Sequence, residues 1–202
     1  MGREFSLAQA SDAVGEIGWR VVLGNLCTTV PVGSLADGAA VVTRAVAVAG
    51  GDAPLGVDLR AGRVVLTLRG PAAVDVARRI SAELPTRPGH VQALEIAIDA
   101  LDIAAVRPFW RAVLAYVDDG GSLVDPLEQG PPLWFQQMDA PRPQRNRIHI
   151  DVSVPHDEAG ARIAAAVAAG GRVLSDHRAP SFWVLADAEG NEACVSTWQG
   201  RD

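Results

Sequence analysis

One short pattern occurs twice in the second half of the chain and limits how this region can fold. Residues 94–98 read Leu-Glu-Ile-Ala-Ile, and residues 148–152 read Ile-His-Ile-Asp-Val. Apolar residues occupy every second position in both segments, which is the period of a half-buried strand. Each segment is followed within a few residues by a helix that begins with a capping residue. We therefore predict two similar halves that pack about a pseudo-two-fold axis.

The second face of each repeated strand carries polar side chains. The alignment of the repeats pairs Glu95 with His149. On the last strand of each half it pairs Gln136 with Cys194. If the halves pack about a pseudo-two-fold axis, these four side chains converge on one cleft. Glu, His and Cys are ligands of divalent metals, and Gln is a weaker one. The alternative is that His149 is merely hydrogen-bonded, Glu95 is solvent-exposed and Cys194 is a small buried hydrophobe.

The first part of the chain predicts a separate α+β domain with an antiparallel sheet. Helical and strand-like patterns follow one another in the order αββαββα, which is typical of helices packed on such a sheet. The predicted segments are 6–17, 19–23, 26–30, 35–48, 57–60, 63–69 and 72–84. The segment 85–91 holds two prolines and a glycine, which favours a domain boundary. We predict a first domain at 1–86, a linker at 87–91 and a second domain at 92–202.

The second domain is predicted to contain the same unit twice: a strand, a helix and then short strands. Its predicted helices are 103–115 and 158–169, with Asp102 and Asp157 as their caps. Its predicted strands are 93–98, 122–124, 133–138, 147–154, 172–174, 182–186 and 192–198. Residues 187–191 are predicted to form a tight turn between the last two strands.

Composition argues against several classes of partner. The formal net charge of −6 argues against nucleic acid as the main partner. No segment reads as a membrane span, and the first residues lack the apolar core of a signal peptide. The two cysteines, Cys27 and Cys194, give no disulfide framework, which predicts a reducing, cytoplasmic location. A homodimer is expected, because small α+β sheets leave edges to cover.

Residues 92–199 resemble the vicinal-oxygen-chelate superfamily, the glyoxalase-like group. The resemblance is carried by Asp102, by Phe109-Trp-Arg-Ala-Val-Leu114, by the strand 148–152 and by Asp187-Ala-Glu-Gly-Asn-Glu-Ala-Cys194. It implies paired βαβββ units around a cleft that often holds a divalent metal. Carried onto this sequence, the metal ligands of the family fall on Glu95, Gln136, His149 and Cys194. Gln137 replaces Gln136 if the register is shifted by one residue. This ligand set is degenerate, so the resemblance leaves metal binding open.

The resemblance implies that a small oxygenated molecule is bound, and two functions stay open. The first is a metal-assisted lyase or isomerase, with one divalent metal ion as cofactor and with Glu95 and Glu192 as catalytic carboxylates. Glu192 lies two residues before Cys194 on the same strand face. The substrate-binding residues would then be Trp134, Gln136 and Arg147. The second function is a non-catalytic protein that sequesters a small molecule, as resistance-type members of the superfamily do.

Residues 6–84 resemble a pterin-4a-carbinolamine dehydratase domain, by the order of elements and by the segment Val57-Asp-Leu-Arg-Ala-Gly-Arg-Val64. That family dehydrates 4a-hydroxytetrahydrobiopterin through a His-His-Pro motif just before this strand pair. Here residues 53–56 read Ala-Pro-Leu-Gly, and no histidine occurs from Met1 to Gly89. Dehydration needs a group that transfers protons near neutral pH. We therefore expect a degenerate domain for binding or oligomerisation, and dehydratase activity is the third alternative.

Overall fold

A computed structural model describes residues 5–50, 53–89, 91–142, 144 and 148–200 of the chain. The chain divides into two compact units, Met1–Ala93 and Leu94–Asp202. Each unit has a hydrophobic core of its own. The two units, called unit 1 and unit 2 below, are therefore described separately.

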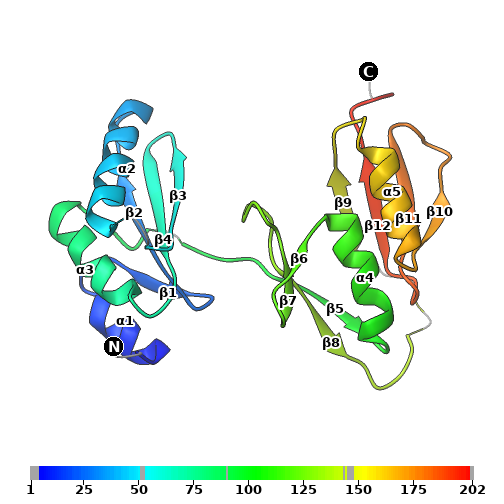
Figure 1. Cartoon of the computed structure of the whole chain (residues 1–202), viewed down its shortest axis with the longest axis horizontal. Helices are drawn as coiled ribbons and strands as arrows, with labels where there is room; N and C mark the ends of the chain where they lie inside the picture. Colours follow the sequence, from blue (N-terminus) through cyan, green and yellow to red (C-terminus); the bar gives the residue numbers. More distant parts are fainter. Residues whose placement is uncertain (1–4, 51–52, 90, 143, 145–147, 201–202) are drawn as a thin grey trace. The chain divides into compact units, whose positions relative to one another are not determined.

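Unit 1 has helices on one face of a four-stranded antiparallel sheet (Figure 1). Its elements are α1 (Leu7–Val14), β1 (Arg20–Val22), β2 (Asn25–Pro31), α2 (Leu35–Ala49), β3 (Leu55–Arg60), β4 (Arg63–Leu68) and α3 (Ala73–Glu83). The strand order is β1-β2-β4-β3, and all neighbouring pairs are antiparallel. The predicted αββαββα order is therefore confirmed.

The core of unit 1 follows from alternation along its strands. Val64, Leu66 and Leu68 of β4 are buried beneath the helices, while the residues between them face the other side of the sheet. The indole of the buried Trp19 donates a hydrogen bond to Ser81 Oγ of α3 at 2.8 Å. Ser6 caps α1, as its spacing to Gln9 favours, with both hydrogen bonds of a capping box.

Unit 2 contains two βαβββ halves in sequence, as predicted (Figure 1). The first half holds β5 (Ile96–Ala100), α4 (Ile103–Leu114), β6 (Val117–Asp118), β7 (Ser122–Val124) and β8 (Leu133–Gln137). The second half holds β9 (Ile150–Ser153), α5 (Ala159–Ala168), β10 (Arg172–Ser175), β11 (Phe182–Ala186) and β12 (Glu192–Ser196). The sheet orders are β5-β8-β7-β6 and β10-β11-β12-β9.

The two sheets of unit 2 have the same mixed topology. The first strand of each half lies parallel to the last strand of that half, β5 beside β8 and β9 beside β12. The remaining pairs are antiparallel. Helices α4 and α5 pack on each other, and both contribute to one core with the apolar side of the strands. The opposite side of each sheet, called its polar face below, carries the polar residues of the strands together with apolar ones such as Trp134 and Val184.

The turn before β12 ties the second half of unit 2 to α4. The buried carboxylate of Asp187 accepts a hydrogen bond from the indole of Trp110 at 2.9 Å. The carboxylate of Glu189 accepts from the backbone N–H groups of Leu101 and Asp102, at 2.9 and 2.6 Å. A negative charge at the start of a helix is favourable. The turn therefore fixes the start of α4 relative to β12.

Several element boundaries differ from the prediction. The repeated strands start later than their pattern indicates, because Leu94 and Ile148 are 67% and 82% exposed and lie before β5 and β9. The helix expected to be capped by Asp157 starts after Glu158, and Glu158 makes no side-chain cap. The short strand β6 was not predicted; it pairs with β7. No described helix combines the length and apolar character needed to cross a bilayer.

Candidate functional site

The polar side of the sheets in unit 2 is set by strand register. Ile96 and Ile98 of β5 pack into the core, so Ala97 and Asp99 face away from the helices. Ala97 is paired with Trp134, and Asp99 with Gln136. Directly paired residues of neighbouring strands lie on the same face. This face of the first half therefore carries an aromatic, an amide and a carboxylate.

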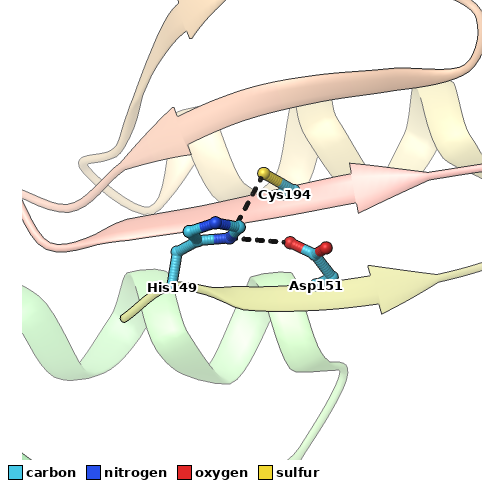
Figure 2. A group of neighbouring side chains, drawn as sticks. All are labelled: His149, Asp151 and Cys194. Carbon is cyan, nitrogen blue, oxygen red and sulfur yellow. Dashed lines mark hydrogen bonds and ion pairs between the residues drawn. The ribbon is translucent and has the colours of Figure 1, made fainter. Parts of the chain in front are cut away.

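In the second half, three potential ligand side chains meet on the same kind of face (Figure 2). His149 immediately precedes β9, Asp151 lies on β9, and Cys194 lies on the adjacent strand β12. His149 Nδ1 is 2.9 Å from Asp151 Oδ1 and 3.9 Å from Cys194 Sγ. One ligand atom from each of the three lies within 4.8 Å of the others. The geometry follows from the parallel register, in which Cys194 is paired with Asp151.

Burial of this group, the His149–Asp151–Cys194 group, is uneven. Cys194 is 7% exposed, whereas the side chains of His149 and Asp151 are 50% and 61% exposed. The sulfur therefore forms the floor, and the imidazole and carboxylate form the accessible sides. An ion held by these three donors would keep a position open to solvent, as catalytic metal sites do.

The donor set fits a divalent metal. Imidazole nitrogen, carboxylate oxygen and thiolate sulfur are the protein ligands of zinc-like ions. Donors that share such an ion lie roughly 3–4 Å apart, given bonds of about 2.0–2.3 Å. The 3.9 Å between His149 Nδ1 and Cys194 Sγ agrees with that spacing, whereas the 2.9 Å between His149 Nδ1 and Asp151 Oδ1 is a hydrogen bond that a shared ion would replace. The arrangement also suits an unmetallated pair, in which Asp151 orients the imidazole through Nδ1.

The predicted site residues are only partly brought together. His149 and Cys194 belong to the group, whereas Glu95 is exposed, precedes β5 and is not part of the group. Glu192 is half-buried at the first position of β12, on the face that Cys194 shares. Arg147 lies outside the described residues. The assigned roles of these residues stay predictions.

The expected equivalence of Gln136 and Cys194 is wrong by two residues. Cys194 is paired with Asp151, which corresponds in the repeat to Ala97 of β5. Ala97 is paired with Trp134, not with Gln136. The position equivalent to the thiol is therefore an indole, and the first half offers no equivalent ligand there.

The alternative residue Gln137 is engaged elsewhere. Gln137 is paired with Ala100 at the end of β5. Its side-chain amide donates to the backbone carbonyls of Leu101 and Met138, both at 2.9 Å. These hydrogen bonds anchor the chain after β8, so Gln137 has a structural role.

Asp151 was missed as a site residue by the sequence reasoning, although a signal for it exists. Residues i and i+2 of a strand lie on the same face. Asp151 stands two residues after His149, so any strand that presents the imidazole presents this carboxylate too. The alignment of the two repeats instead paired His149 with Glu95 of the first half.

A cavity of about 470 Å³ lies beside the polar face of β5, within the range of roughly 300–1,000 Å³ usual for small-molecule pockets. Its lining consists of Ala97, Asp99, Leu101, Met138, Pro141, Arg142, Gln144, Glu189, Gly190 and Asn191. Arg142 Nη2 lies 3.8 Å from Asp99 Oδ2, and both side chains are largely exposed. Arg142 and Asp99 thus give the cavity a cation and an anion that solvent, or a ligand, can reach, and Glu189 adds a second carboxylate to the lining.

A family model and several solved structures are each similar to about half of the chain. A model of the glyoxalase-like domain matches residues 95–196, half of the chain. No curated protein is similar enough to the chain to count as a match. The fosfomycin resistance protein FosX from Mesorhizobium loti is 9% identical, with a TM-score of 0.44 over 54% of this chain and 92% of that chain.

Two further solved structures are similar at the same level. FosX from Listeria monocytogenes, in complex with Mn(II) and a sulfate ion, is 11% identical, with a TM-score of 0.43 over 52% of this chain and 87% of that chain. A glyoxalase/bleomycin resistance protein/dioxygenase family enzyme from Burkholderia phytofirmans PsJN is 14% identical, with a TM-score of 0.39 over 51% and 95%. With the match over residues 95–196, the chain belongs to the glyoxalase-like domain family of the vicinal-oxygen-chelate superfamily.

Proposed function

We propose that unit 2 binds a small oxygenated molecule beside a divalent metal ion held by His149, Asp151 and Cys194, and acts on it as a metal-assisted lyase or isomerase. The observation that carries the proposal is the convergence of three different donors on the polar face of one sheet. Two of these donors are accessible, so a substrate oxygen can reach the same point. When bound, the ion would supply Lewis acidity toward that oxygen.

The chain supplies further groups around this point. Glu192 shares the strand face of Cys194, and we assign it the transfer of a proton to or from the substrate. In the first half, Trp134 and Gln136 occupy the corresponding polar face and are assigned to substrate binding. A half-buried indole offers an apolar wall, and an exposed amide offers both a donor and an acceptor.

Metal content of protein purified without a histidine tag tests the proposal. We expect about one equivalent of a divalent metal per chain in the wild type, and less than about a tenth in His149→Ala, because removal of one ligand from a three-ligand site removes most of the affinity. His156→Ala is the matched control: His156 is also exposed but bonds to Trp198, outside the group. Metal-free wild-type protein, or equal metal in both variants, would reject the proposal.

Binding without catalysis is the second candidate, and the cavity beside β5 favours it. Among the described residues, its lining includes none of the three donors of the group, so a ligand can be held there without a metal. The Arg142 guanidinium suits a carboxylate or another oxyanion. A thermal-shift screen with small carboxylic acids checks this. Stabilisation that survives His149→Ala and is lost in Arg142→Ala would assign binding to the cavity alone.

Unit 1 contributes no residue to this proposal. Its order of elements agrees with the resemblance to pterin-4a-carbinolamine dehydratases, but the family match covers residues 95–196 only. Dehydratase activity of unit 1 therefore stays a prediction. The sequence has no histidine before His90, which argues against this activity. Turnover of a pterin carbinolamine by the whole protein is the assay that decides it.

A further inference from the structure

Cys194 is the most firmly placed member of the His149–Asp151–Cys194 group. It lies in the middle of β12, which is paired on one side with β11 and on the other with β9. Its direct neighbours in the sheet are Val184 and Asp151. Because backbone pairing on both sides fixes the strand, the Cα and Cβ atoms of Cys194 stay beside Asp151, and only rotation about the Cα–Cβ bond can move the sulfur. An ion bound by His149 and Asp151 therefore lies within reach of this sulfur.

We infer that the ion of this site is a thiophilic divalent metal of the zinc class, bound through Cys194 Sγ, and not a hard ion such as Mg²⁺ or Mn²⁺. This inference rests on the proposed metal site and adds its chemical selectivity. Hard dications need several oxygen ligands, whereas thiolate and imidazole ligands favour zinc, cobalt and nickel. Asp151 is the only side chain of the group that offers oxygen. The donor set is thus one oxygen, one nitrogen and one sulfur.

The second cysteine provides an internal control. Cys27 lies on β2 of unit 1, half-buried, and its Sγ is 3.8 Å from the hydroxyl of Thr67. Burial raises the pKa of the Cys27 thiol, so at neutral pH it stays protonated and is a poor metal ligand. In the described part of the chain, Cys27 belongs to no group of metal-ligating side chains. The two thiols are therefore distinguishable by substitution.

Titration of the metal-free full-length protein with Co²⁺, followed by absorption, tests the inference. A thiolate bound to Co²⁺ gives a charge-transfer band in the near ultraviolet. We expect this band in the wild type and in Cys27→Ser, and its loss in Cys194→Ser. In competition, an equimolar amount of Zn²⁺ should remove the Co²⁺ band, while about a hundred-fold excess of Mn²⁺ should leave it. The competition uses the wild type, so it does not depend on the folding of any variant.

The outcomes separate this inference from the proposed function. Binding of Co²⁺ to the wild type but not to His149→Ala would support the metal site. If in that case the wild type lacks the charge-transfer band, or Mn²⁺ removes the band, the metal site stands and the thiolate assignment is overturned. If Cys194→Ser keeps the band, the assignment is likewise overturned. If the wild type binds neither Co²⁺ nor Zn²⁺, both the inference and the proposed metal site fail.

Discussion

At the scale of single residues, Asp187 shows how unit 2 stabilises a buried charge. Its side chain accepts four hydrogen bonds: from Trp110 Nε1, from Asn191 Nδ2, and from the backbone N–H groups of Glu189 and Asn191, all at 2.8–3.0 Å. A carboxylate removed from water is tolerated only with such compensation. Three of the four bonds lie inside the turn that the sequence predicts. The bond from Trp110 joins residues 77 positions apart, which no local pattern indicates.

We expect Trp110→Phe to destabilise unit 2 by about 1–3 kcal/mol, because it leaves a buried carboxylate with one hydrogen bond fewer and a small gap. Urea unfolding followed by far-ultraviolet circular dichroism measures the change. The exposed Trp198 supplies the control, since Trp198→Phe should change the midpoint little. Equal midpoints for Trp110→Phe and the wild type would show that the Asp187 bond contributes nothing measurable.

Individual site residues also show how much of the site the sequence could predict. The pairing of repeated strands singled out His149 and Cys194, which the structure places side by side. Glu95 was expected beside them because the same alignment places it opposite His149. Like His149 before β9, Glu95 lies just before β5, where strand pairing does not fix it, and it is exposed and not part of the group. Asp151 follows from strand periodicity alone, which is the more reliable signal because it depends on one strand and not on the packing of two.

At the scale of elements, the packing between α4 and the end of α5 depends on a small residue. Gly171 follows α5, and a Cβ built on it would lie 2.2 and 2.5 Å from ring atoms of Phe109, which is fully buried. The aromatic ring can move only into other core residues. This contact explains why a glycine follows Gly170, where the left-handed turn at the end of α5 already requires one.

We therefore expect Gly171→Ala to lower the stability of unit 2 by about 1–3 kcal/mol through overpacking of the ring of Phe109. Gly160→Ala is its matched control: Gly160 lies within α5, and a Cβ there meets no atom within 4 Å. That change should raise stability by about 0.5 kcal/mol, because alanine favours the helix. Urea midpoints of the two variants should move in opposite directions, and movement in the same direction would contradict the overpacking argument.

A second connection between elements is an ion pair. Arg107 of α4 binds both carboxylate oxygens of Asp118 of β6 at 2.8 Å and donates to the Ser122 carbonyl of β7 at 3.1 Å. The hydrogen bonds from Arg107, and after them that from the Gly120 N–H, lower the pKa of Asp118 from 3.8 to about 2. The short strand β6, which the sequence did not predict, is thus fixed by side chains as well as by its pairing with β7.

The lowered pKa gives a pH dependence with a definite sign. A carboxylate whose pKa is depressed in the folded state stabilises that state above its unfolded pKa, here 3.8. This contribution is lost as the pH falls through the folded value of about 2. We expect Asp118→Asn to be less stable than the wild type at pH 6, with the difference shrinking between pH 4 and 2. Urea midpoints across this range measure it. A difference that is constant with pH would show that the carboxylate charge has no role.

At the scale of the whole molecule, the fold class was predictable because the apolar periodicity of the segments and their order along the chain indicate the same architecture. Apolar periodicity gave the elements, and the order αββαββα and the repeated βαβββ units gave the architecture. Strand register was not predictable to the residue, since a shift by two keeps every side chain on its face. For this reason Gln136 was matched with Cys194 although Trp134 holds the equivalent position. The expected homodimer stays a prediction, and light scattering of the purified protein tests it.

We expect the proposed function to need only unit 2, because unit 2 has a core of its own and contains all three ligands of the group. The core residues of unit 1 all lie between Phe5 and Leu84, and those of unit 2 all lie from Ile96 onward. We therefore expect a fragment of residues 94–202 to unfold cooperatively in urea, because all ligands of the group and its supporting strands lie within it. It should also give the Co²⁺ absorption band of the full-length protein. Cooperative unfolding without the band would mean that unit 1 contributes to the metal site, whereas a fragment without cooperative unfolding would show that the core of unit 2 is insufficient by itself.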